Sequence, residues 1–200
     1  MPTHHRVPLF LASLFVVVVC WSAIAPADNR VWWAEMVPIF AIFIGLAVTY
    51  KHFQFSNTSY LLMSVLLIMH TIGAHYTFAK VPFDWVTETF AFERNHYDRV
   101  AHFSVGFYAY AAAELLLRKQ WARPVTAMLF GLFLIMAVAA AYEIIEWQFA
   151  VIEGGNAGIE FLGSQGDPWD AQKDMLADTL GAIAALVLFY FSHWVKPAKD

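Results

Sequence analysis

The sequence predicts an all-α membrane protein, a bundle of about six transmembrane helices with both termini in the cytoplasm. Two observations carry this prediction. Hydrophobic residues make up 60% of the chain, and apolar stretches of about 20 residues, the length that crosses a hydrocarbon core, recur along it. We expect one polytopic domain over residues 1–200, with helices near 7–25, 31–50, 58–76, 98–117, 123–147 and 174–195.

The first stretch resembles a secretory signal, because basic residues precede it and small residues follow it. Pro26, directly after the would-be cleavage site, argues against cleavage, so we expect a retained helix. The net charge is −4 and the chain has no run of basic residues, so we expect no nucleic-acid partner. The single Cys20 excludes an internal disulfide and a cysteine-based metal site.

Lysine and arginine in the short loops predict the orientation, since cytoplasmic loops carry an excess of both. With the N-terminus inside, the cytoplasmic side receives Arg6, Lys51, Arg118, Lys119, Arg123, Lys196 and Lys199. The outer side receives Arg30, Lys80, Arg94, Arg99 and Lys173. The connections 77–97 and 148–172 would then lie outside, and each is long enough to cover or bind something.

Ionisable residues gather at the outer ends of four predicted helices. Up-and-down topology brings these ends to one face of the membrane, so we expect the groups to converge. They are His70 and His75, Asp98, Arg99 and His102, Glu143 and Glu146 beside Tyr142, and Asp170, Asp174 and Asp178. Of the two histidines in the third helix, which point about 140° apart, we expect the deeper His70 to face the cluster. Asp178 lies more than one turn inside an apolar segment, and an ionisable residue at that depth indicates a functional site.

Three arrangements can neutralise such a cluster. The first is a divalent metal, either zinc, iron or manganese, which imidazole and carboxylate ligands suit. The candidate ligands are His70, His102, Glu143, Glu146, Asp174 and Asp178. The second is a structural network of Arg99, Lys173 and protonated carboxylates, and the third is a proton or ion pathway. No HExxH, CxxC or paired ExxH motif decides among them.

Three blocks of sequence carry a family resemblance. They are 98–103 (DRVAHF), 142–148 (YEIIEWQ, of which the tyrosine, both glutamates and the glutamine carry the resemblance) and 174–181 (DMLADTLG). In this order they resemble the signature blocks of VanZ-like membrane proteins. With 161–170 (FLGSQGDPWD) they more closely resemble the YjdF family of bacterial inner-membrane proteins, which implies a multipass protein of that membrane without an established activity. Asp178 stands where the VanZ-like pattern usually has asparagine, and the extra carboxylate favours either a cation at the site or a carboxyl group that retains its proton.

The first functional hypothesis is a metal-assisted hydrolase or transferase that acts on a lipid or lipid-linked substrate from the outer side of the membrane. In it Asp98 orients His102, an acidic side chain such as Glu143 activates a bound water, and Arg99 meets a phosphate or another anionic headgroup. The alternative is a non-catalytic membrane protein, such as a transporter, a small-molecule binder or an assembly partner, whose polar network is structural. Neither an inverted repeat nor matching broken helices favour transport.

Overall fold

The computed structural model describes residues 6–194 and forms nine helices there, with no strand in that part of the chain. They are α1 (Arg6–Ser22), α2 (Asn29–Thr49), α3 (Asn57–Tyr76), α4 (Asp84–Thr89), α5 (Tyr97–Val105), α6 (Tyr108–Arg118), α7 (Pro124–Glu153), α8 (Gly155–Leu162) and α9 (Asp170–Trp194). The all-α fold is therefore confirmed. Residue 195, where the last helix was predicted to end, lies outside the described residues, as do Lys196 and Lys199.

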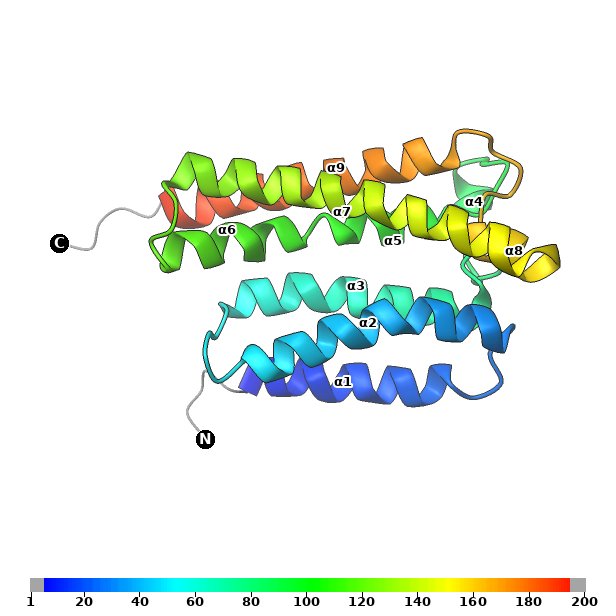
Figure 1. Cartoon of the computed structure of the whole chain (residues 1–200), viewed down its shortest axis with the longest axis horizontal. Coiled ribbons are helices and arrows are strands. Elements are labelled where there is room, and N and C mark those ends of the chain that lie inside the picture. Colours follow the sequence, from blue (N-terminus) through cyan, green and yellow to red (C-terminus); the bar gives the residue numbers. More distant parts are fainter. Residues whose placement is uncertain (1–5, 195–200) are drawn as a thin grey trace.

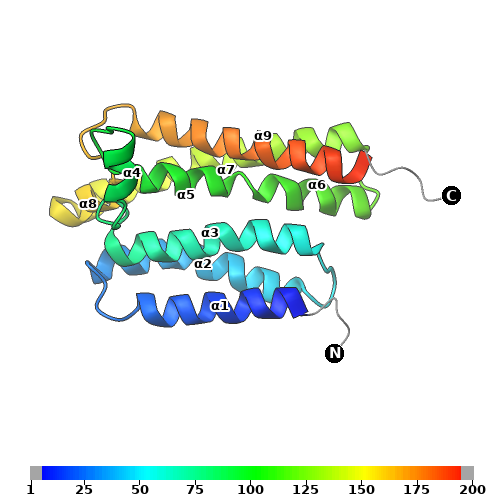
Figure 2. The same ribbon diagram turned by 180° about the vertical axis from the view of Figure 1, so that it is seen from behind.

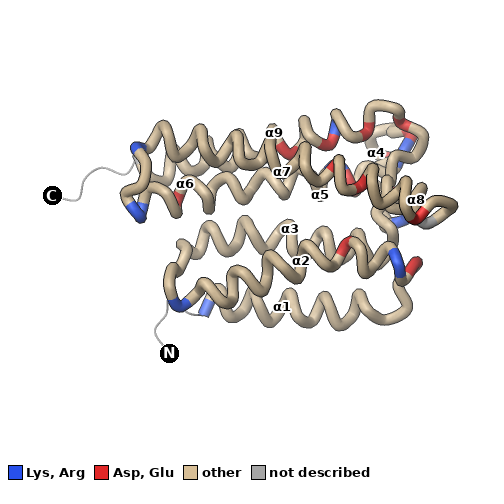
Figure 3. The backbone as a smooth tube through the Cα atoms, viewed as in Figure 1, with Lys and Arg blue, Asp and Glu red and all other residues tan. Residues whose placement is uncertain are grey.

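Five segments are long and apolar enough to cross a membrane: α2, α3, α5 together with α6, α7, and α9. With 17 residues, α1 is shorter but also apolar. Figure 3 shows that most charged residues lie toward the two ends of the bundle, whereas acidic residues of α2, α7 and α9 reach into it from one end. The long apolar helices fit the hydrocarbon core of a bilayer, so this is a multipass membrane protein.

The helices form two groups that lie side by side (Figure 1). In the first group α1 and α2 both pack on α3, and in the second α7 and α9 pack on each other and on the broken helix formed by α5 and α6. The view from behind shows the same division (Figure 2), and α3 joins the groups through its contacts with α5 and α6. By contrast, α2 touches α8 but makes little contact with α7. The backbones of α2 and α7 therefore approach each other less closely than those of the packed pairs, and we call the space between these two helices the seam.

Both described chain ends lie at the same end of the bundle (Figure 1). We call the opposite end the polar end; it comprises α4, α8 and the adjoining ends of the long helices. The convergence predicted from up-and-down topology is therefore present in the fold. That the polar end faces the outside of the cell stays a prediction.

The connections at the polar end differ from the prediction. α7 continues to Glu153, past the expected end at 147, because the residues after 147 remain mostly apolar, and Gly154 then ends it with φ 64°. Since α8 follows directly, much of the 148–172 connection is helical instead of an open loop. The helix expected over 98–117 is interrupted at Gly106, between α5 and α6.

α9 crosses α5 so closely that glycine is required on α9 and directly after α5. A Cβ added to Gly181 would lie 1.9 Å from the Phe103 carbonyl oxygen, and one added to Gly106 would lie 2.2 Å from the Ala182 amide nitrogen. Small residues let membrane helices approach in this way.

The substitution Gly181→Ala should destabilise the protein by about 1–3 kcal/mol or more, because the new methyl group can be accommodated only if a backbone moves. The measurement is the unfolding temperature of the purified protein in a non-ionic detergent. Gly45→Ala in α2 is the matched control, since nothing lies within 4 Å of its added Cβ. Equal unfolding temperatures for the two variants would contradict the close crossing.

Candidate functional site

A cavity of about 150 Å³ lies between the two helix groups at the polar end. Its walls come from α2, α3, α5, α7, α9 and the end of α8. One part of the lining is apolar, with Pro38 and Ile42 of α2 and Val138 and Ala139 of α7. These residues lie along the seam between α2 and α7. The rest of the lining holds most of the buried charge of the protein.

His102 of α5 lies among three carboxylates. Its Nδ1 is 3.3 Å from Asp178 Oδ2, and its Nε2 is 3.7 Å from Asp98 Oδ1 and 3.9 Å from Asp174 Oδ1. All four side chains are buried. A proton on Nδ1 would be donated to Asp178 and would leave the Nε2 lone pair facing the other two carboxylates.

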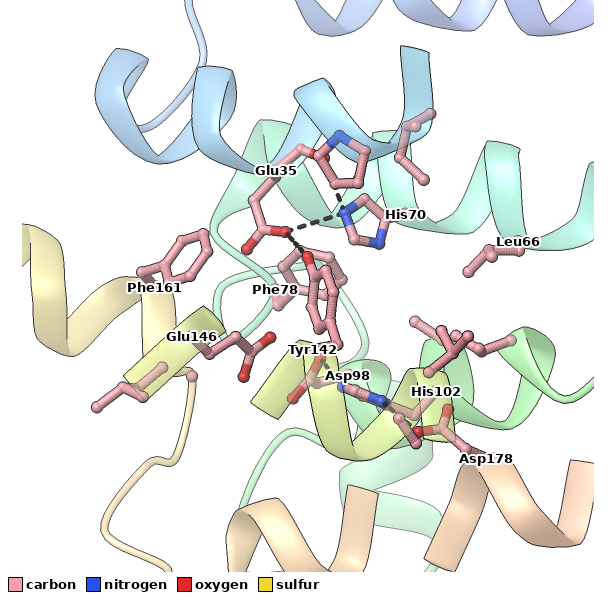
Figure 4. Close-up of a pocket in the computed structure, with 18 of the residues that line it drawn as sticks. Glu35, Leu66, His70, Phe78, Asp98, His102, Tyr142, Glu146, Phe161 and Asp178 are labelled. Carbon is pink, nitrogen blue, oxygen red and sulfur yellow. Dashed lines mark hydrogen bonds and ion pairs between the residues drawn. The ribbon is translucent and has the colours of Figure 1, made fainter. Parts of the chain in front are cut away.

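The sequence produces this arrangement through two pairs spaced four residues apart. Asp98 and His102 lie one turn apart on α5, and Asp174 and Asp178 lie one turn apart on α9, so each pair shares a helix face. The close crossing of the two helices then brings the faces together. Figure 4 shows His102 between Asp98 and Asp178 on the wall of the cavity.

Asp98, His102 and Asp174 form a candidate metal site. One ligand atom from each residue lies within 4.8 Å of the others, and the side chains that the structure describes form no other such group of His, Cys, Asp or Glu. Two ligand atoms at about 2.1 Å from a tetrahedral ion are about 3.4 Å apart, so the observed spacings need only a small contraction. Asp174 Oδ1 is also buried without a well-directed hydrogen bond.

Two arginines hold a chain of ion pairs next to this group. Asp170 Oδ1 accepts hydrogen bonds of 2.6 Å from both Arg94 and Arg99. Arg99 Nη1 also lies 2.5 Å from Asp174 Oδ1, so it competes with a metal ion for that oxygen. Arg94 donates further to the backbone carbonyls of residues 163 and 164, which ties the α8–α9 connection to the chain before α5. Arg94 was not singled out from the sequence, because it stands in an apparent loop.

A second polar cluster occupies the opposite wall of the cavity (Figure 4). Glu35 Oε2 lies 2.9 Å from His70 Nε2 and accepts a hydrogen bond of 2.9 Å from the Tyr142 hydroxyl. His70 thus lines the cavity, as expected, but its side chain contacts Glu35 and is not part of the group around His102. His75 instead donates to the Ser22 carbonyl. The sequence signal for Glu35 was a carboxylate one turn inside an apolar helix.

Glu143 and Glu146 lie nearly one turn apart on α7, and neither belongs to the candidate metal group. Glu146 is 9% exposed and lines the cavity. Glu143 is not among the lining residues, but its Oε1 is buried without a hydrogen-bond partner. The structure therefore separates these two predicted ligands from His102, Asp98 and Asp174.

Two groups at the polar end, outside the membrane-spanning segments, have shifted pKa values. A hydrogen bond of 2.6 Å from Lys173 lowers the pKa of Asp167 below its usual value. Burial lowers the pKa of His96, and the positive charges of Arg94 and Arg99 lower it further. At neutral pH the polar end therefore presents an ionised Asp167 beside a neutral His96.

The substitution Asp170→Asn should lower the unfolding temperature clearly, because it leaves the partly buried guanidinium groups of Arg94 and Arg99 without the buried carboxylate that they share. Removing one partner of a buried ion pair costs about 3–5 kcal/mol. Glu153→Gln is the control, since its partner Arg30 is 76% exposed and exposed pairs contribute about 1 kcal/mol or less. Similar unfolding temperatures for the two variants in detergent would show that the buried ion pairs do not hold the polar end.

Comparison with known proteins adds the family. Residues 7–194 match the family model described as "Predicted membrane protein (DUF2238)". The inner membrane protein YjdF of Escherichia coli (strain K12) is 32% identical over 192 residues, which cover 93% of this chain and 91% of that protein. No solved structure matches significantly. The resemblance to the YjdF family is thus confirmed, whereas the link to VanZ-like proteins stays a prediction. The chain belongs to the DUF2238 family of predicted membrane proteins and is a multipass protein of the bacterial inner membrane.

Proposed function

We propose that this protein is a metal-dependent hydrolase or transferase that acts on a lipid or lipid-linked substrate from the periplasmic side of the inner membrane. The position of His102 carries the proposal. One ring nitrogen contacts Asp178, the other faces Asp98 and Asp174, and the ring lines a cavity at the polar end. In this proposal Asp98 and Asp174 are ligands with His102, and Asp178 takes the orienting role first expected of Asp98.

The three ligands suit zinc, iron or manganese by type and leave a coordination position for water or substrate. When bound, such an ion supplies an acidic water and polarises a carbonyl or phosphoryl oxygen. Asp178 accepts a hydrogen bond from the protonated Nδ1 of His102 and thereby keeps Nε2 free to act as a ligand. Carboxylate partners of this kind commonly fix the tautomer and orientation of metal-binding histidines.

The apolar lining supports a lipid substrate. Pro38 and Ile42 on one side of the seam and Val138 on the other line the cavity that also contains His102. An acyl or prenyl chain lying between α2 and α7 would place its polar end toward His102. Chemistry at that end would then take place at the depth of the headgroups.

Glu143 and Arg99 keep the roles that the sequence predicted for them, but the structure supports the two roles to different degrees. Glu143 remains the proposed general base, because its buried Oε1 has no hydrogen-bond partner. Since Glu143 does not line the cavity, this role requires its side chain to turn toward the metal-bound water. Arg99 is already paired with Asp170 and Asp174. A phosphate contact by Arg99 therefore requires that one of these ion pairs opens.

A non-catalytic membrane protein is the second candidate, and the 2.5 Å contact between Arg99 and Asp174 favours it. In this case arginine already neutralises a proposed ligand. The ion pairs from Arg94 through Asp170 and Arg99 to Asp174 would then fix α5 against α9. Such a network needs no ion.

Metal content of the detergent-purified protein, measured by elemental mass spectrometry, separates the two candidates. We expect about one equivalent of a transition metal in the wild type and its loss in the His102→Ala/Asp174→Ala double variant. His75→Ala is the control for removal of a histidine at the polar end. His70→Ala should also keep the metal, because His70 pairs with Glu35 on the opposite wall.

Unfolding temperatures of the same samples complete the test. A folded double variant without metal supports the proposed function, and Glu143→Gln should then keep the metal but lose activity on lipid-ester or lipid-phosphate substrates. Absence of stoichiometric metal from the wild type, even after reconstitution, would overturn the metalloenzyme proposal and leave the ion-pair network.

A further inference from the structure

We infer that the cavity binds an organic cation, an ammonium group carried on an apolar chain, and that Glu146 is the carboxylate that receives it. The inference rests on the proposed function in that it names the ligand class of the same cavity. Binding of this ligand, however, requires neither the metal ion nor turnover.

The polar lining of the cavity is acidic. Four carboxylates and two histidines line it, and neither lysine nor arginine is found among its described lining residues. The six are Glu35, Asp98, Glu146 and Asp178, with His70 and His102. A lining of this charge repels an anionic ligand and favours a cation.

Three of these carboxylates already have a partner. Glu35 pairs with His70 and accepts from Tyr142, while Asp98 and Asp178 both lie against His102. Their charge is therefore shared with neighbouring side chains. Asp178 Oδ1 is buried without a hydrogen bond, but the other oxygen of this carboxylate contacts His102.

Glu146 is the exception. It is 9% exposed, and no hydrogen bond or ion pair joins it to the described part of the chain. Figure 4 shows its carboxylate directed into the same space as Tyr142 and Asp98. The carboxylate of Glu146 therefore faces the open space of the cavity, where a ligand with a positive group can pair with it.

Aromatic side chains indicate which kind of cation fits. Phe78, Tyr142 and Phe161 line the cavity together with Glu146 (Figure 4). Aromatic faces attract ammonium groups, quaternary ones above all. A metal ion instead takes oxygen and nitrogen ligands, which the group around His102 supplies. The surroundings of Glu146 therefore favour an organic ammonium.

The apolar seam supplies the place for the rest of the ligand. Pro38, Ile42 and Val138 line the same cavity, so an alkyl chain can extend from the ammonium group toward the membrane. A group linked to that ammonium would lie beside His102. This is where the proposed function requires the reacting bond.

The test compares three probes of equal chain length: octylammonium, octanol and octanoate. Their binding to the full-length protein is measured by calorimetry in a non-ionic maltoside detergent with a chelator present. We expect octylammonium to bind about tenfold or more tightly than octanol, and octanoate more weakly than either. Glu146→Gln should lose that advantage and keep the octanol affinity. Glu153→Gln, on the same helix but outside the cavity, should behave as the wild type.

Equal affinities for the three probes, or undiminished octylammonium binding by folded Glu146→Gln, would overturn the inference. Should Glu146→Gln fail to fold, Phe161→Leu replaces it. That variant removes one ring, and it should weaken binding of octyltrimethylammonium but not of octanol. Unchanged octyltrimethylammonium binding by folded Phe161→Leu would also overturn the inference.

Two further arms identify the source of the ammonium and separate this inference from the proposed function. Tighter binding of lysophosphatidylethanolamine than of octylammonium would support a lipid headgroup as the ligand, and the reverse order would support a free amine. Repeating the titrations after metal loading tests independence. Octylammonium binding without any metal site would leave this inference standing while the metalloenzyme proposal falls. A metal site without octylammonium binding would overturn this inference and leave the metalloenzyme proposal standing.

Discussion

The close crossing of α5 and α9 is the constraint on which the site depends. Gly106 and Gly181 let the two backbones meet without an intervening side chain, and this contact brings carboxylates of α9 to His102 of α5. Buried charges in a membrane helix are stable only when they face such partners. A wider crossing would leave Asp174 and Asp178 facing apolar side chains. Neutralisation of these carboxylates therefore depends on how closely the two helices pack.

Arg99 connects the two candidate functions. It contacts Asp174 through one nitrogen and Asp170 through the other, at 2.5 and 2.6 Å. If a metal ion takes the oxygen of Asp174, Arg99 keeps its contact with Asp170 and loses only half of its pairing. The ion-pair network and the metal site can therefore be two states of the same residues. The balance between them depends on which cation Asp174 binds more strongly.

The sequence predicted the membrane helices and their convergence because length and hydropathy determine which segments cross a bilayer. It could not assign partners within the cluster. His70 pairs with Glu35, across the cavity from His102, and this depends on how α2 and α3 are rotated. Helices that are apolar on nearly all sides carry little periodic signal for that rotation. The end of α7 was missed for a related reason, since bilayer thickness does not limit a helix that continues beyond the hydrocarbon core.

The two walls of the cavity differ in how their charge is satisfied, and this difference bears on what the site can do. A metal ion at Asp98, His102 and Asp174 would neutralise that wall but offer no direct partner to Glu146, which belongs to none of these contacts. Glu146 therefore needs either a proton or a separate cation. An ammonium bound there fixes one end of a ligand, and the chain in the seam fixes the other. The bond between them is then held near His102 without any help from Arg99, which is already occupied. Positioning by two separate contacts is what an enzyme needs to hold a reacting group within reach of a metal-bound water.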